Sequence, residues 1–241
     1  MDEVPLIEGD PVQNLQIGSK LPEGLRRRLI DFLRSNFDCF AWSHKDMPGI
    51  DPEIIMHKLQ YPEWLANVLV VRKENGKWRV CIDFTDLNKS CPKDPFPLPH
   101  IDKLVDTTAA HQLMSIMDAF SGYNQILMHP EDQKKTSFMT SRGIYCYKIM
   151  PFGLKNARST YQKLVNMMFA DQIGQTMEVY IDDMLVKSIE AEDYISHQQQ
   201  AFTTLREYNM KLNPAKCSFG VSSGKFLGYI SCGNRILHCR F

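Results

Sequence analysis

The chain has 241 residues, of which 44% are hydrophobic and 23% charged, so its composition is that of a globular protein with a substantial core. Its 28 Lys and Arg residues balance 28 Asp and Glu residues, and a formal net charge of zero argues against a general nucleic-acid binder, which usually has a basic excess. The acidic start, MDEVPLIEGD, lacks the apolar region of a signal peptide, and no apolar run is long enough to span a membrane. We therefore expect an intracellular protein, cytoplasmic or nuclear. Its 7 cysteines form no C-x-x-C pair, which favours reduced thiols.

The first half of the chain predicts one helix and one hairpin. Residues 1–50 predict a loop followed by a helix, because apolar residues recur at helical spacing in LPEGLRRRLIDFLRSNF. Residues 65–86 predict a β-hairpin, since two apolar runs flank ENGK and Asn75-Gly76 is a strong turn signal. The prolines of CPKDPFPLPHID predict an extended connection.

The second half predicts a sheet with helices. HQLMSIMDAF predicts a strand that ends near Asp118, HPEDQKKTSF opens like a helix, and GIYCYKIMPFG favours a strand. A helix is predicted from Ala157, a second hairpin over residues 177–187 with its turn on two aspartates, and another helix over 195–208. Short strands in KLNPAKCSFG and KFLGYIS complete an α+β pattern, with helices segregated on a mainly antiparallel sheet.

Three carboxylates lie where these strands end. Asp118 closes one predicted strand, and Asp182 and Asp183 lie at the hairpin turn. If the strands are neighbours, the three groups meet at one edge of the sheet, where they raise each other's pKa values. Two Mg²⁺ ions about 4 Å apart would relieve this repulsion and clamp the oxygens of a phosphoryl transfer. From these residues alone, an ordinary Asp-rich turn and a surface charge at Asp118 are the simpler interpretation.

Six segments, in order, resemble the reverse transcriptases of gypsy-type long-terminal-repeat retrotransposons. YIDD at 180–183 resembles the Y-x-D-D box of that family, and MDAFSGYNQI at 117–126 resembles the block with its first catalytic aspartate. KWRVCIDFTDLNK at 77–89 resembles a fingers motif, MPFGLKNARSTYQ at 150–162 a nucleotide-pocket block, and KLNPAKCSFG and FLGY later palm motifs.

The resemblance implies a right-hand polymerase fold of the α+β class, with an antiparallel palm sheet backed by helices, partial fingers and no thumb. Residues 1–60 would resemble the connection between protease and polymerase, 61–112 would be partial fingers, 113–231 the palm and 232–241 an aberrant tail. Family members have several tens of additional residues where HKLQ meets YPEW, so we expect a truncated chain with an internal deletion and weakened template binding.

The resemblance also implies the reacting groups. Asp118, Asp182 and Asp183 would hold two Mg²⁺ ions, with Mn²⁺ as a substitute, while the primer 3′-hydroxyl attacks the α-phosphate of a deoxynucleoside triphosphate (dNTP). Lys216 would protonate the leaving pyrophosphate as a general acid. A surface lysine is the alternative for Lys216.

Further residues would bind the substrates. Arg79 would grip the triphosphate with help from Lys73, since a guanidinium suits bidentate phosphate contact. The ring of Tyr123 would exclude a ribose 2′-hydroxyl, and Phe152 and Gly153 would lie beneath the incoming base and the template. The alternative for Arg79 and Lys73 is an exposed hairpin cation, and the alternative for Tyr123 is core packing. For Phe152 and Gly153 the alternative is a tight turn. The implied primer and template contacts are Tyr180, Phe226, Leu227, Gly228 and Tyr229.

We therefore expect the RNA-directed DNA polymerase domain of a retrotransposon Pol polyprotein, acting on dNTPs and a primed RNA or DNA template. An intact element would work in a virus-like particle. We expect its protease, ribonuclease H and integrase to be separate from this chain. The alternative is an inactive relic with at most weak nucleic-acid binding. A metal-dependent phosphohydrolase is less supported, because none of the 7 histidines adjoins an aspartate box.

Overall fold

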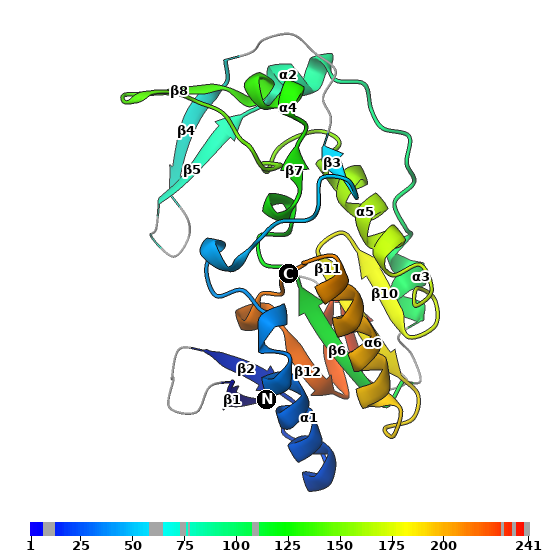
Figure 1. Cartoon of the computed structure of the whole chain (residues 1–241). Coiled ribbons are helices and arrows are strands. Elements are labelled where there is room, and N and C mark those ends of the chain that lie inside the picture. The colour runs from blue at the N-terminus through cyan, green and yellow to red at the C-terminus, as the bar shows by residue number, and fades with distance from the viewer. Residues whose placement is uncertain are drawn as a thin grey trace. The chain divides into compact units, whose positions relative to one another are not determined.

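The chain forms two compact units. The structure is a computed structural model that describes residues 1–6, 13–57, 65–72, 76, 78–107, 111–227, 229–232 and 235–238 (Figure 1). Unit 1 comprises Met1–Pro48, Pro97–Gly122 and Gln162–Phe241, and unit 2 comprises Gly49–Phe96 and Tyr123–Tyr161. Each unit combines segments that are far apart in the sequence, whereas the four predicted domains are continuous ranges, and those ranges stay a prediction.

Unit 1 is built on a six-stranded sheet in the order β1-β2-β12-β6-β11-β10 (Figure 1). Neighbouring strands are antiparallel except β2 and β12, which are parallel. The predicted mainly antiparallel sheet is thus confirmed. Its strands are β1 (Asp2–Pro5), β2 (Asn14–Ile17), β6 (Leu113–Asp118), β10 (Met177–Tyr180), β11 (Asp183–Ser188) and β12 (Ser218–Val221).

The predicted loop at the start of the chain was wrong, because β1 and β2 are strands of this sheet. Leu15 and Ile17 point into the core, with 1% and 0% of their surface exposed, and they alternate with the less buried Asn14 and Gln16. Four residues are too few for this alternation to be distinguished from a loop, and the partner of β2 lies at the other end of the chain.

Helices cover one face of the sheet. The predicted helices are confirmed as α1 (Glu23–Ser35) and α6 (Tyr194–Glu207), whose rings Phe32 and Phe202 lie 5.2 Å apart. Phe202 also stacks on Phe219 of β12, at 6.2 Å. The remaining helical elements of unit 1 are η1 (Phe37–Cys39), η2 (His44–Asp46) and η5 (Pro214–Lys216).

The other face of the sheet contacts α3 (Ile101–Asp106) and a three-stranded sheet of β13 (Ser223–Phe226), β14 (Tyr229–Cys232) and β15 (Arg235–His238). Leu104 of α3 and Phe226 of β13 share a buried cluster with Met114, Leu185 and Val221. At Gly224 an added Cβ would lie 2.3 Å from Ile116 Cδ1, so a larger residue there would require the Ile116 side chain to move.

Unit 2 consists of short hairpins and helices. The predicted hairpin over 65–86 is confirmed, and Gly76 has a φ of +78°. GIYCYKIMPFG forms a shorter strand than predicted. The elements are β3 (Met56–His57), β4 (Asn67–Arg72), β5 (Trp78–Asp83), α2 (Thr85–Ser90), most of η3 (Gly122–Gln125), β7 (Leu127–Met128), α4 (Pro130–Gln133), η4 (Lys134–Thr136), β8 (Phe138–Thr140) and β9 (Gly143–Tyr145); α5 (Ala157–Met168) has residues in both units.

A buried histidine is expected to make the stability of unit 2 depend on pH. His57 is 2% exposed, its Nδ1 lies 2.9 Å from Thr160 Oγ1, and burial lowers its pKa to about 4. An unfolded histidine has a pKa of about 6.5, so the unfolded chain binds more protons below that pH and stability falls as the pH decreases toward 4. Between pH 7 and pH 5 we expect a loss of about 2 kcal/mol in the free energy of unfolding from this group.

Urea unfolding at both pH values measures this loss. In His57→Gln, the pH-dependent difference should shrink by that amount, whereas the exposed His44→Gln should behave as the wild type. Equal pH dependence in all three proteins would contradict the assignment to His57.

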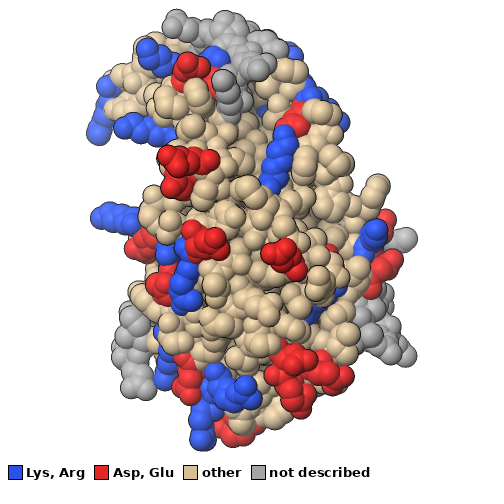
Figure 2. Space-filling view, turned by 45° about the vertical axis from the view of Figure 1, so that its right-hand side comes forward, with Lys and Arg blue, Asp and Glu red and all other residues tan. Residues whose placement is uncertain are grey.

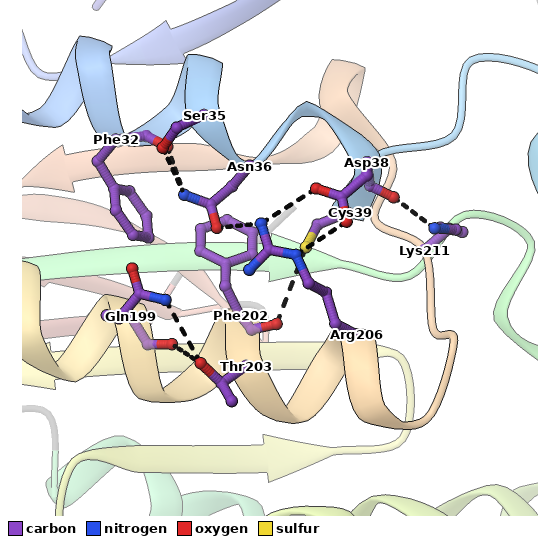
Figure 3. A network of polar contacts seen from close by, with 10 residues as sticks. All are labelled: Phe32, Ser35, Asn36, Asp38, Cys39, Gln199, Phe202, Thr203, Arg206 and Lys211. Carbon is purple, nitrogen blue, oxygen red and sulfur yellow. Dashed lines mark hydrogen bonds and ion pairs between the residues drawn. The ribbon is translucent and has the colours of Figure 1, made fainter.

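A polar network holds the N-terminal segment on α6 (Figure 3). Arg206 donates to Asp38 through Nε at 2.8 Å and Nη2 at 3.0 Å, and Nη2 also donates to Asn36 Oδ1. The guanidinium holds the pKa of Asp38 below its usual range, and Lys211 donates to the carbonyl of the same residue. Residues 36–39, predicted to belong to a linker, are therefore fastened to the same compact unit as the sheet.

Asp38→Asn should weaken this attachment only modestly. The pair is partly exposed, so we expect a loss of about 1 kcal/mol in unfolding free energy together with faster proteolysis after α1. Asp171→Asn, at an exposed carboxylate outside the network, is the control, and identical proteolysis of the two variants would argue against the attachment.

Among the residues that the structure describes, no helix is both long and apolar enough to cross a membrane.

Candidate active site

The two aspartate-bearing strands are neighbours, as predicted. β6 and β11 pair antiparallel over six residues, and Asp118 lies directly opposite Asp183. Residues opposite each other in a sheet project to the same face. The two carboxylates therefore share the face that contacts α3 and β13, at the end of the strands.

The turn that carries Asp182 is strained. Tyr180 pairs with Asp183, so Ile181 and Asp182 form a two-residue turn, and Ile181 has a φ of +56°. This left-handed conformation is unusual for a β-branched residue and costs about 1–3 kcal/mol. The N–H of Ile181 donates to Oε1 of the fully buried Gln162 at 2.8 Å, which holds the turn in this conformation.

Lys216 lies at the same edge of the sheet. The residues before it run beside the end of β6, where the N–H of Asn213 donates to the carbonyl of Asp118 at 2.8 Å. The side chain of Asn213 then caps η5 by accepting from the N–H of Ala215 at 3.2 Å. This arrangement brings Lys216 Nζ to 3.2 and 3.1 Å from the two carboxylate oxygens of Asp118.

The three carboxylates resist ionisation. Burial, followed by the charges of Asp118 and Asp183, raises the pKa of Asp182 to about 7. Burial raises the pKa values of Asp118 and Asp183 as well, although the Lys216 ammonium opposes the increase at both. The predicted repulsion between carboxylates therefore contributes at Asp182 and Asp183, while burial is the main cause at all three groups.

The donor set has the chemistry of a site for hard divalent cations. All three side chains offer carboxylate oxygens, and Oδ1 of Asp182 is buried with no hydrogen-bond partner. However, no group of three or more ligand-type side chains in the described part of the chain is assembled around one point. Both oxygens of Asp118 instead face the Lys216 ammonium, so cation binding would require this lysine to yield.

Three of the five predicted nucleotide-binding residues lie around one pocket of unit 2, with a volume of about 440 Å³. Arg79, Phe152 and Gly153 line it together with Asn124, and the Arg79 guanidinium lies 5.9 Å from the centre of the Phe152 ring. Lys73 lies outside the described residues. The pocket therefore combines a cation, an aromatic ring and amide groups.

Tyr123 supports this pocket from the core. It is 8% exposed and packs edge-on against Phe152 and Tyr161, at 5.0 and 5.6 Å. Gly153 has a φ of +97°, a conformation that suits glycine, and its carbonyl accepts from Asn88 Nδ2 at 2.7 Å. Core packing and a tight turn, the alternatives from the sequence, are thus both present, and they coexist with the pocket.

The predicted primer contacts differ in accessibility. Phe226 is 2% exposed and belongs to the buried cluster, against which Tyr180 and Leu227 also pack. The hydroxyl of Tyr229 donates to Asp102 Oδ1 at 3.0 Å, on the surface. Gly228 lies outside the described residues. Phe226 and Tyr229 pair with each other in the β13–β14 hairpin, which the buried Phe226 anchors.

The sequence did not reveal three residues near the site. Gln162 supports the strained turn, and Glu178 and Lys187 form a buried ion pair at 2.7 Å between β10 and β11. Opposite charges on the two strands of a predicted hairpin were the available signal for the pair. No comparable signal exists for Gln162, because a glutamine in a helix usually faces water.

The ordered segments correspond to a known family. Residues 71–231 match the family model described as reverse transcriptase (RNA-dependent DNA polymerase). The chain belongs to the reverse transcriptase family. Membership of this family implies a dependence on divalent metal ions, and it agrees with the carboxylate cluster at the end of β6 and β11.

Retrotransposon proteins are similar in sequence. A Retrovirus-related Pol polyprotein from transposon 412 of Drosophila melanogaster is 36% identical over 186 residues, which cover 73% of this chain and 15% of that protein. The corresponding polyprotein from transposon gypsy of the same organism is 33% identical over 156 residues, or 65% of this chain and 15% of that one. The predicted resemblance to gypsy-type Pol polyproteins is confirmed, and the chain spans only about 15% of the length of these relatives.

Solved structures confirm the predicted polymerase fold. A foamy viral protease-reverse transcriptase in complex with RNA/DNA hybrid is similar with a TM-score of 0.79 at 13% identity, covering 91% of this chain and 34% of that one. The same kind of protein in complex with dsDNA gives a TM-score of 0.80 at 15% identity, covering 91% and 53%. On the face drawn in Figure 2, basic side chains of this chain are interspersed with acidic and uncharged ones, in keeping with its net charge of zero.

Proposed function

We propose that this domain catalyses RNA-directed DNA synthesis, adding dNTPs to the 3′-hydroxyl of a primer. The observation that carries the proposal is the pairing of Asp118 with Asp183 beside the turn that holds Asp182. Three half-buried carboxylates with raised pKa values are destabilising for the protein alone, which favours a role with cations and phosphates.

In this role, Asp118, Asp182 and Asp183 would hold two Mg²⁺ ions, or Mn²⁺ in their place. Bound divalent cations would neutralise the phosphates and clamp the attacking and leaving oxygens. Gln162 keeps the turn in place, so the backbone that carries Asp182 is positioned before substrate arrives. Lys216 leaves Asp118 and donates its proton to the departing pyrophosphate.

The pocket of unit 2 receives the nucleotide. Arg79 binds the triphosphate through its guanidinium, with help from Lys73, and Phe152 and Gly153 lie under the base and the template. The ring of Tyr123 stands beneath the sugar and disfavours a ribose 2′-hydroxyl. This assignment is supported by the grouping of Arg79, Phe152 and Gly153 around one pocket.

The nucleic-acid partner is a primed RNA or DNA template. Two relatives in fold have been solved with RNA/DNA hybrid and with dsDNA. The primer contacts are assigned to Tyr180 and to the FLGY hairpin, Phe226–Tyr229. Since the net charge is zero, we expect weak and strongly salt-dependent binding. The other activities of a Pol polyprotein would lie outside this domain.

A primer-extension assay tests the proposal. The purified protein is given a DNA primer on an RNA template, dNTPs and Mg²⁺, beside Asp182→Asn as the inactive comparison. Extension by the wild type alone supports polymerase activity, and EDTA should abolish it.

Equal behaviour of the two proteins would refute the proposal. Salt-dependent binding of the primed template without extension would identify the chain as a relic that binds nucleic acid. Release of phosphate from model esters without extension would point to a hydrolase.

A further inference from the structure

A buried ion pair joins the strands of the catalytic hairpin, β10–β11. Lys187 Nζ lies 2.7 Å from Glu178 Oε1, and the two side chains are 4% and 3% exposed. Replacing such a pair by apolar residues is often neutral or stabilising, so overall stability alone does not explain its presence. Neither residue has a role in the proposed function.

The lysine also reaches beyond the hairpin. Its ammonium donates to the carbonyl of Thr107, directly after α3, at 3.1 Å. A cation at this end of a helix satisfies a carbonyl without an intrahelical partner and interacts favourably with the helix dipole. On its other side, α3 contacts the β13–β14 hairpin, because Leu104 shares a cluster with Phe226 and Asp102 accepts from the Tyr229 hydroxyl.

The position of β10 explains why the hairpin needs this support. β10 is the edge strand of the six-stranded sheet: β11 is its partner strand, and in the described part of the chain its other pairing is an isolated bridge between Met177 and Ile173. Glu178 and Val179 line a pocket of about 610 Å³, together with Leu104 of α3 and Ile173 after α5. Because open space adjoins this edge beyond the bridge at Met177, lateral support for β10 comes from β11, from residues 173–174, from Gln162 and from the ion pair to α3.

We propose that Glu178 and Lys187 are positioning residues that couple the catalytic hairpin to the β13–β14 hairpin through α3. The functional meaning of this coupling rests on the proposed function, in which β10–β11 carries Asp182 and Asp183 and β13–β14 carries primer contacts. The coupling then keeps the primer 3′-hydroxyl aligned with the carboxylates.

Hydrogen exchange of the amides in residues 223–232 tests the coupling without using activity. Glu178→Met/Lys187→Met removes both charges and keeps the side-chain volume, so we expect a melting temperature near that of the wild type and exchange about 10-fold faster. The swap Glu178→Lys/Lys187→Glu keeps a pair but moves the ammonium to β10, and it should accelerate exchange similarly. Asp86→Asn/Lys89→Gln, which removes an exposed ion pair, should exchange as the wild type.

A double-mutant cycle with Tyr229→Phe decides whether α3 carries the coupling. If it does, adding Tyr229→Phe to the double methionine variant accelerates exchange less than the product of the separate effects. Independent, multiplicative effects overturn the proposal, as does unchanged exchange in the methionine or the swap variant. If the methionine variant does not fold, the swap variant takes its place in the double-mutant cycle.

Activity gives a second readout. With active sites titrated, the methionine variant should lower kcat about 10-fold and leave KM for dNTP unchanged, and a purely structural role would leave both unchanged. If the variants show the expected changes in exchange but the wild type extends no primer, the proposed function is refuted and the coupling still stands.

Discussion

Asp182→Asn is expected to abolish primer extension and to make the protein more stable. Extension should fall by about 10³-fold or more, as for the loss of a group that stabilises charge at the reacting phosphate. The free energy of unfolding should rise by about 4 kcal/mol in EDTA at pH 8, since burial and two neighbouring carboxylates raise the pKa of Asp182 from 3.8 to about 7 and one pKa unit corresponds to about 1.4 kcal/mol. For a chain of this size, this corresponds to an increase of about 8–16 °C in Tm.

The two effects have opposite signs, which separates a functional carboxylate from a structural one. Asp171→Asn changes an exposed carboxylate and should alter neither extension nor Tm. A lower Tm for Asp182→Asn would mean that the ionised side chain stabilises the turn, and the argument from repulsion would then be wrong. Calorimetry in EDTA and single-turnover extension in Mg²⁺ measure the two quantities.

Gln162→Leu is expected to disturb the same turn from behind. The substitution leaves the N–H of Ile181 buried without an acceptor, which costs about 1–3 kcal/mol, and removes the bond that holds this residue at φ +56°. We expect a loss of about 2–3 kcal/mol in unfolding free energy. Extension should fall by about 10²-fold, because a small misplacement of catalytic groups has effects of that size.

Gln162→Glu tests whether the hydrogen-bond acceptor is what matters, because glutamate keeps an acceptor oxygen at this position and leucine does not. Its carboxylate still accepts from Ile181 N–H, so extension should exceed that of Gln162→Leu. Gln199→Leu, at an exposed position of α6, controls for replacing a helical glutamine by leucine. Wild-type stability and extension in Gln162→Leu would show that the turn keeps its conformation without this bond.

Features with local causes could be predicted from the sequence. The hairpin with Asp182 and Asp183 follows from two short apolar runs around a polar pair, and the helix α6 follows from its apolar periodicity. The neighbouring position of Asp118 required the resemblance to a family, because no local pattern specifies which strands pair.

Features that depend on distant partners could not be predicted. β2 becomes a strand by pairing with β12 at the other end of the chain. Glu178 lies in a strand whose two faces are both covered, so the usual alternation of buried and exposed residues fails and would have placed this carboxylate in water. The hydrogen bond of Gln162 depends on a left-handed residue in another element, which no periodicity reveals.

The parallel pairing of β2 with β12 has a consequence for synthesis of the chain. Gln16 lies opposite Ser218, so about 200 residues must be added after β2 before its parallel partner β12 exists. At ~5–20 residues per second this takes about 10–40 s, during which the buried face of β2 has no sheet to join. The last strand of the six-stranded sheet to be translated therefore controls when β2 can join it. Ribosome-bound chains that end before residue 218 should lose β2 to protease, while those that extend well beyond residue 221 should retain it.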